Sequence, residues 1–234
     1  MESPVKVILF DLDGTLMVSG GAGQKAINAV FADRYGIQDA FGDIVPHGMM
    51  DPVIFQQILD RFGITAEDRD ALLAELAEDY AERLEPIMRE HERARLMPGV
   101  VELLEALHGR DHVLVGLVTG NYEKTGRIKL DRFGLNKYFD FGAFSSDHPV
   151  RADLVPVAVA RAEAIHGGPI GLGRHVVLVG DTPKDVEAAL INGVTSVAVA
   201  TLGHTVEQLG AEGAHFVFED FSDTAAVLAA MGVS

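Results

Sequence analysis

The sequence predicts an α/β fold: a doubly wound, Rossmann-like core with a parallel sheet, and an all-helical cap domain inserted into it. Two observations lead to this prediction. Short apolar runs alternate with helical patterns over residues 98–234, which is typical of a parallel sheet covered by helices on both faces. One further apolar run, residues 5–10, is separated from them by residues 24–92, which show only helical patterns. The 234 residues suffice for one large domain or two small ones.

The first apolar run, residues 5–10, leads directly into Asp11, Asp13, Gly14 and Thr15. Because its apolar residues do not alternate with polar ones, we expect a strand buried on both faces. Two carboxylates close together at the end of such a strand repel each other unless a cation, a shared proton or water offsets their charge. The same residues also fit a strand followed by an Asx-type turn without any chemistry.

The block that follows is expected to be wholly helical. Asp51 and Pro52 predict a helix N-cap followed by a proline at the first helical position. Residues 66–88 predict a long acidic helix rich in alanine and leucine. We expect the loop at residues 46–50 to face the crevice between the two domains.

The boundaries of the insertion follow from these patterns. We assign residues 17–96 to the cap domain, and residues 1–16 together with 97–234 to the core, joined by two short links. Residues 21–26 match the dinucleotide-binding pattern G-x-G-x-x-A. That pattern has to follow a strand directly, and here it does not, so a flexible hinge is the favoured interpretation.

The rest of the core consists of alternating strands and helices. The helix that Pro98 and Gly99 begin is followed by predicted strands at residues 113–118, 139–144, 175–179, 196–200 and 216–218. A helix that ends near residue 133 is expected after the strand at residues 113–118. Three further helices are expected at residues 153–165, 183–191 and 222–231.

Composition excludes several classes of function. The net charge of −16 argues against binding to nucleic acid or to an anionic membrane surface. The absence of cysteine excludes disulfides, thiolate zinc sites and cysteine nucleophiles, and it fits a reducing compartment. No apolar run approaches the roughly 20 residues that span a bilayer. We therefore expect a cytoplasmic protein without membrane or nucleic-acid partners, either a monomer or a homodimer.

Polar motifs follow three of the predicted core strands, at residues 11–15, 119–121 and 180–185. The carboxyl ends of strands in an open parallel sheet meet at one crevice, so these motifs should converge. Several carboxylates in one crevice form a site for a hard cation, and Mg²⁺ suits a small set of oxygen ligands. The nine histidines lack the spacing of zinc ligands. Residues 182–185 also fit a capping box, a purely structural interpretation.

On these motifs the chain resembles the haloacid dehalogenase-like hydrolase superfamily, in the phosphoglycolate phosphatase-like branch with a helical cap. The resemblance is carried by Asp-Leu-Asp-Gly-Thr at residues 11–15, Thr119, Gly-Asp-Thr-Pro-Lys-Asp at residues 180–185, and Pro98-Gly99-Val100 after the cap. It covers nearly the whole chain.

The resemblance implies roles for four aspartates. Asp11 would be the nucleophile that forms an aspartyl-phosphate. Asp13 would protonate the leaving alcohol and then activate water. Mg²⁺ would be held by Asp11, the carbonyl oxygen of Asp13, and Asp181, with Asp185 bracing these ligands.

The resemblance also implies a phosphate-binding set: the Thr119 hydroxyl, the Gly120 N–H and, beside them, Asn121. A cation should complete it. The family usually has a lysine ahead of the helix after the third strand, whereas this chain has Arg151 in that region. Arginine keeps its charge and can bind two oxygens, so Arg151 is the predicted cation. Lys184 and Lys129 are the alternatives.

These features predict a Mg²⁺-dependent phosphomonoester hydrolase of a small phosphorylated metabolite. The presence of Asp13 argues against dehalogenation, which has no leaving alcohol to protonate. Two alternatives stay open: a phosphomutase of a sugar phosphate on the same scaffold, and a non-catalytic relative that only binds a ligand.

Overall fold

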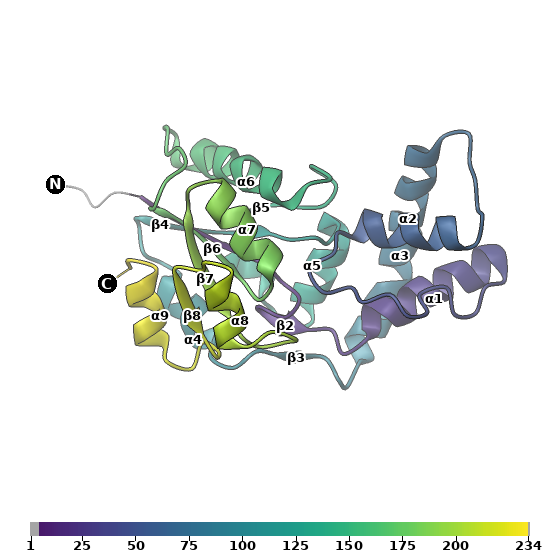
Figure 1. Ribbon diagram of the computed structural model, residues 1–234, viewed down its shortest axis with the longest axis horizontal. Helices are drawn as coiled ribbons and strands as arrows, with labels where there is room; N and C mark the ends of the chain where they lie inside the picture. Colours follow the sequence, from purple (N-terminus) through teal and green to yellow (C-terminus); the bar gives the residue numbers. More distant parts are fainter. Residues whose placement is uncertain (1–4, 234) are drawn as a thin grey trace.

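A parallel sheet forms the centre of the computed structural model, which describes residues 5–233 (Figure 1). Its strands are β1 Lys6–Phe10, β4 Val113–Val118, β5 Phe141–Ala143, β6 Val176–Gly180, β7 Thr195–Val199 and β8 Phe216–Phe218. Their order is β5-β4-β1-β6-β7-β8, with all neighbours parallel. The predicted doubly wound sheet is confirmed, and β1 lies at its middle with Phe10 opposite Leu117 and Val179.

Helices cover both faces of the sheet. The core helices are α4 Val100–Leu107, α5 Glu123–Asp131, α6 Arg151–His166, α7 Pro183–Ile191, α8 Val206–Ala211 and α9 Thr224–Ala230, with a 3₁₀ turn at Asn136–Tyr138. Val7 and Leu9 of β1 belong to the cluster that includes α6 and α7 residues, whereas Ile8 and Phe10 belong to the cluster that includes α4 and α9 residues. Burial on both faces explains why this strand does not alternate.

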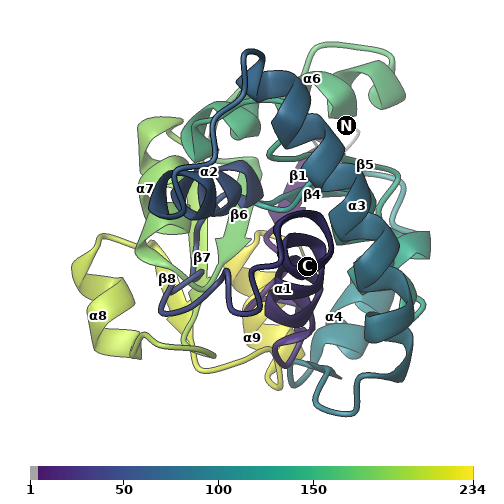
Figure 2. The ribbon, with the colours of Figure 1, turned by 90° about the vertical axis from the view of Figure 1, so that its right-hand side faces the viewer.

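The inserted block forms a separate group of helices beyond one end of the sheet (Figures 1 and 2). They are α1 Ala22–Tyr35, α2 Asp51–Arg61 and α3 Arg69–Glu90. Residues 36–50 between α1 and α2 contain no helix, so the prediction that residues 24–92 are wholly helical is wrong there. The block connects to the core through a two-stranded antiparallel ribbon, β2 Met17–Val18 and β3 Arg95–Leu96, which the sequence did not predict.

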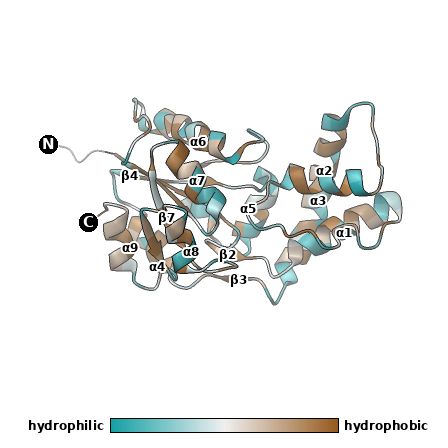
Figure 3. Cartoon of the chain, viewed as in Figure 1, coloured by the Kyte–Doolittle hydropathy of each residue, from teal (hydrophilic) through white to brown (hydrophobic). Residues whose placement is uncertain are grey.

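One hydrophobic cluster extends from the sheet into the inserted helices. It contains Phe10 of β1, Leu16, Phe31 of α1, Phe55 of α2 and Tyr80 of α3. Figure 3 shows the corresponding pattern, with hydrophobic strands in the interior and hydrophilic residues along much of the helices. The domain boundaries at residues 17 and 96 stay a prediction. Within residues 5–233, none of the helices combines the length and the apolarity needed to cross a membrane.

Candidate active site

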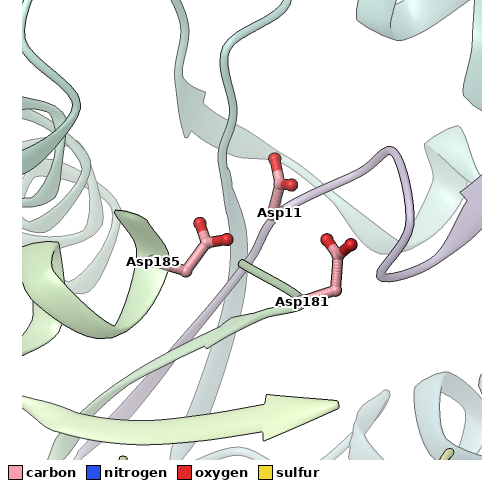
Figure 4. Close-up of side chains that lie close together, drawn as sticks. All are labelled: Asp11, Asp181 and Asp185. Carbon is pink, nitrogen blue, oxygen red and sulfur yellow. The ribbon is translucent and has the colours of Figure 1, made fainter. Parts of the chain in front are cut away.

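Three carboxylates meet beyond the ends of β1 and β6. Oxygen atoms of Asp11, Asp181 and Asp185 lie within 4.8 Å of one another, and all three residues are buried. Figure 4 shows Asp11 just after β1, Asp181 just after β6 and Asp185 at the start of α7, with their carboxyl groups around one space. The predicted convergence of the first and third motifs is therefore present in the structure.

Glycine permits this close approach at two positions. Gly14 has φ +88°, and a Cβ atom there would overlap the Asp181 carboxyl group. A Cβ atom on Gly180 would overlap the Asp185 side chain in the same way. The Thr15 hydroxyl donates a hydrogen bond to Oδ1 of Asp181, at 3.1 Å, and fixes its orientation. Any larger residue at position 14 or 180 would push these carboxylates apart.

Asp185 serves the helix and the site together. Its Oδ2 accepts hydrogen bonds from the Thr182 backbone N–H (3.1 Å) and hydroxyl (2.6 Å), which is the capping box expected at the start of α7. Its Oδ1 accepts a hydrogen bond from Nη1 of Arg151, at 2.6 Å. The capping box at residues 182–185 is therefore confirmed, and the role of Asp185 in bracing a metal site stays a prediction.

Arg151 lies between two of the carboxylates. Its Nη1 contacts Asp185, and its Nη2 donates to Oδ1 of Asp11 at 3.1 Å. Burial would lower the pKa of Arg151, but the charges of Asp11 and Asp185 outweigh burial and raise it. Of the three predicted candidates for the cation, Arg151 is the one that contacts Asp11, the predicted nucleophile. Lys184 lies beside Gly48 of the cap loop, and Lys129 contacts Asp13 instead.

The carboxylates have more negative charge than one arginine offsets. Burial raises the pKa of Asp11 from 3.8 to about 7; Arg151 opposes this effect, and the charge of Asp185 adds to it. Burial, followed by the charges of Asp11 and Asp185, raises the pKa of Asp181 to about 9. These shifts are the expected signature of carboxylates that need a further cation. The buried, all-oxygen donor set fits Mg²⁺.

Asp13 is held by two donors on the same oxygen. Nζ of Lys129 and Nδ2 of Asn121 contact its Oδ2 at 2.5 and 2.9 Å, and Nζ of Lys129 also donates to Oδ1 of Asn121 at 2.6 Å. Burial lowers the pKa of Lys129, but the charges of Asp13 and Asp51 outweigh burial and raise it. Within residues 5–233, Oδ1 of Asp13 has no hydrogen-bond partner, so it is the oxygen available to a ligand.

The motif after β4 contributes one free hydroxyl donor and one free N–H. Oγ1 of Thr119 accepts hydrogen bonds from the Asn121 backbone (3.3 Å) and side chain (2.8 Å), which leaves its proton to be donated. The Gly120 N–H has no partner among the described residues. The side-chain amide nitrogen of Asn121 donates two hydrogen bonds, one to Oδ2 of Asp13 and one to Oγ1 of Thr119. In this structure Asn121 therefore contacts Asp13 and Thr119, and phosphate binding by Asn121 stays a prediction.

A cavity of about 280 Å³ connects this group of residues with the cap. Asp11, Asp13, Thr119, Arg151 and Asp181 line its core end. Pro46, His47, Gly48 and Met49 line it from the cap loop, as expected. The last residue of the predicted loop, Met50, does not: it is 6% exposed and packs in the hydrophobic cluster of β1 and α6.

Sequence reasoning missed the role of Asp51. Asp51 is the first residue of α2 with Met50 as its N-cap, so it is not the cap that the Asp-Pro pair predicted. Its Oδ2 instead accepts hydrogen bonds from the Tyr122 N–H (3.0 Å) and the Thr125 hydroxyl (3.3 Å) of the core. Burial raises its pKa to about 6. The Asp-Pro sequence is the same whether the aspartate is the N-cap or the first residue of the helix, so the sequence does not separate the two positions.

Comparison with known proteins identifies the class. The family model described as haloacid dehalogenase-like hydrolase matches residues 5–193, and the chain belongs to this family. The phosphoglycolate phosphatase of Rhodospirillum rubrum is 28% identical over 238 residues, covering 93% of this chain and 88% of that protein. The tyrosine-protein kinase PtkA of Mycobacterium tuberculosis is 28% identical over 202 residues, but the match covers 85% of this chain and only 62% of PtkA.

Solved structures share the fold. CbbY from Rhodobacter sphaeroides, solved in complex with phosphate, aligns with a TM-score of 0.70 at 18% identity over 98% of this chain and 100% of CbbY. A hydrolase from Pseudomonas syringae aligns with a TM-score of 0.66 at 24% identity, covering 96% of this chain and 98% of that one. At these identities the likeness concerns the fold alone.

Proposed function

We propose that this chain is a Mg²⁺-dependent phosphomonoester hydrolase of a small phosphorylated metabolite, similar to the phosphoglycolate phosphatases, and that it works through an aspartyl-phosphate. The observation that supports this most is the meeting of Asp11, Asp181 and Asp185 within 4.8 Å, with Arg151 bonded to two of them. A buried carboxylate beside a fixed cation is suited to attack a phosphorus atom.

In the first step, a carboxylate oxygen of Asp11 bonds to phosphorus and the ester P–O bond breaks. The leaving oxygen takes the proton of Asp13, so an alcohol departs. Arg151 holds Oδ1 of Asp11 at 3.1 Å and thereby fixes the plane of the nucleophile. The Thr119 hydroxyl and the Gly120 N–H are the donors we assign to the phosphate oxygens.

In the second step, water attacks phosphorus and gives a proton to Asp13 through its free Oδ1. The bond between phosphorus and Asp11 breaks, which releases inorganic phosphate and restores both aspartates. One water is consumed, and one alcohol and one phosphate are formed.

The residues that would hold Mg²⁺ are Asp11, Asp181 and the carbonyl oxygen of Asp13. Asp185, which contacts Arg151 and caps α7, would brace them. The bound ion would supply positive charge next to the phosphate oxygens. This charge is needed because the chain carries a net charge of −16.

The test is Asp11→Asn. We expect it to abolish Mg²⁺-dependent release of phosphate from p-nitrophenyl phosphate, because the amide cannot form the intermediate. The control is Asp111→Asn, an exposed aspartate just before β4, at the opposite end of the strand from the site. Undiminished turnover by Asp11→Asn would refute the proposal.

The alternatives give different results in the same assays. A phosphomutase would retain the aspartyl-phosphate until a sugar phosphate accepts the group, whereas a hydrolase loses it to water. A ligand-binding relative would bind phosphate esters without turnover under any metal.

A further inference from the structure

We propose that the leaving group is an uncharged alcohol with a second hydroxyl group that binds Tyr80, and not a carboxylate such as that of phosphoglycolate. This inference rests on the proposed function and specifies its substrate class. It follows from the charges, the apolar lining and one unpaired phenol in the cap half of the cavity.

The cavity is lined by one arginine and one lysine, and both are already paired with carboxylates of this chain. Arg151 is paired with Asp11 and Asp185, and Lys129 with Asp13. The other basic lining residue, His47, is exposed. No lysine or arginine of the described chain therefore lines the cavity with its charge free for a substrate anion.

The cap half is largely apolar, with Ser19, Gln24 and His47 as further polar lining residues, and it contains an acidic residue. Ile27, Phe41, Ile44 and Ile54 line it, and three of these are buried to 4% exposure or less. Asp51 also lines the cavity, and its Oδ2 accepts hydrogen bonds from Tyr122 and Thr125. A carboxylate on the leaving group would lose its water, meet no free cation and lie near Asp51 and Asp13, which is unfavourable.

Tyr80 supplies the polar contact in this half. It is 1% exposed, lines the cavity, and packs its ring edge-on against Phe55 with centroids 5.8 Å apart. Its hydroxyl makes no hydrogen bond within residues 5–233, although a buried phenol normally finds a partner. Gly23 leaves room beside it: a Cβ there would lie 3.0 Å from the Tyr80 oxygen.

The phenol is suited to a neutral partner. Burial raises the pKa of Tyr80, so it stays protonated and can donate one hydrogen bond or accept one. Tyr80 lines the same cavity as Asp11 and Asp13. A short alcohol whose phosphate lies at Asp11 can therefore meet this hydroxyl within one cavity.

The experiment compares matched phosphate monoesters with Mg²⁺ and the full chain: alkyl, hydroxyalkyl and carboxyalkyl phosphates of two to four carbons, the shortest carboxyalkyl member being phosphoglycolate. We expect kcat/KM for the preferred hydroxyalkyl phosphate to exceed that of its carboxyalkyl counterpart by about tenfold or more. Equal or better hydrolysis of the carboxyalkyl esters overturns the proposal.

Two variants test the assigned wall. Tyr80→Phe should lower kcat/KM for the hydroxyalkyl ester about fivefold more than for the alkyl ester, mainly through KM, as expected for one lost hydrogen bond. Ile44→Lys should raise the ratio of carboxyalkyl to alkyl hydrolysis, whereas Ile44→Met, of similar length but uncharged, should not. If Tyr80→Phe affects both esters equally, Tyr80 has no part in recognition.

p-Nitrophenyl phosphate separates the two levels of inference. If the wild type hydrolyses it and Asp11→Asn does not, the proposed function stands, and a preference for carboxylates would overturn the substrate class alone. If neither protein hydrolyses any ester, the proposed function itself is refuted.

Discussion

At the scale of single residues, Asp13 is the position where the structure adds most to the sequence. Lys129 and Asn121 bind the same oxygen of its carboxyl group, so the side chain has one fixed and one free oxygen. Proton transfer depends on geometry first, and a fixed carboxylate presents its free oxygen in one direction. Lys129 is 5% exposed and donates to both partners, so we treat it as a positioning residue for Asp13.

Replacing Lys129 tests this assignment. Lys129→Met should lower kcat about a hundredfold with little change in KM, because correctly placed acid–base groups contribute factors of this order. Steady-state kinetics give the split, and thermal unfolding shows whether the variant folds. The control is Lys124→Met on the same helix: Lys124 pairs with Glu78 at the surface, and its loss should barely affect the rate. A fall in KM together with kcat, or an unchanged kcat, would contradict the positioning role.

At the scale of elements, the start of α2 is tied to the start of α5. The Asp51 N–H donates to the Gly120 carbonyl oxygen at 2.7 Å, and its side chain accepts from Tyr122 and Thr125. The same loop places the Met49 carbonyl against Gly120, where a side chain would not fit. These contacts hold α2 and the motif at residues 119–121 in a fixed position relative to each other.

Asp51→Ala should lower the free energy of unfolding by about 1–3 kcal/mol, because the Tyr122 N–H and the Thr125 hydroxyl would then lack this acceptor. Asp51→Asn keeps an acceptor oxygen and should lower it by less. Denaturant unfolding gives these values. Asp70→Ala, at an exposed position in the first turn of α3, is the control and should change stability by at most about 0.5 kcal/mol. If Asp51→Ala behaves like the control, the contact contributes nothing to stability.

At the scale of the whole molecule, the fold brings buried negative charge together from distant parts of the chain. Asp11 and Asp181 have raised pKa values, about 7 and about 9, against an ordinary value of 3.8. Between the ordinary pKa of 3.8 and these raised pKa values, the metal-free folded chain binds more protons than the unfolded chain. Its stability is therefore greatest below about pH 4 as far as these groups are concerned, and it falls as the pH rises toward 9.

A thermal-unfolding series tests this linkage. With EDTA, the melting temperature should fall from about pH 5 to about pH 9. On the proposed function Mg²⁺ binds the ionised carboxylates, so the stabilisation that it gives should grow over the same pH range. Asp181→Asn should flatten the EDTA curve and remove most of the response to Mg²⁺. A melting temperature in EDTA that rises with pH, or a wild type indifferent to Mg²⁺, would be the contrary result.

Features that depend on residues close together in the sequence could be predicted, whereas most contacts between distant residues could not. The inner strands were predictable because burial on both faces leaves continuous apolar runs, as in Lys6–Phe10. The edge strand Phe216–Phe218 is partly exposed, but it is apolar as well. Placing Asp11 near Asp181 needed only the rule that parallel strand ends meet. The ribbon strands Met17–Val18 and Arg95–Leu96 were missed because two residues show no periodicity. Lys129 and Asp13 are 116 residues apart, and no local pattern connects them.

The β2–β3 ribbon determines how the inserted helices could be removed or replaced by protein engineering. Val18 pairs with Arg95, so the chain leaves the core and re-enters it at neighbouring positions. The whole excursion between them can be cut out and closed with a tight turn, or exchanged for another module, without rerouting any strand of the sheet. The carboxylate cluster and Arg151 belong to the part that would stay, and Tyr80 belongs to the part that would leave. On the proposed assignments, the groups for the reaction and the group for substrate selection therefore lie in different segments, and an exchanged module would have to supply its own partners for the core side of the shared hydrophobic cluster.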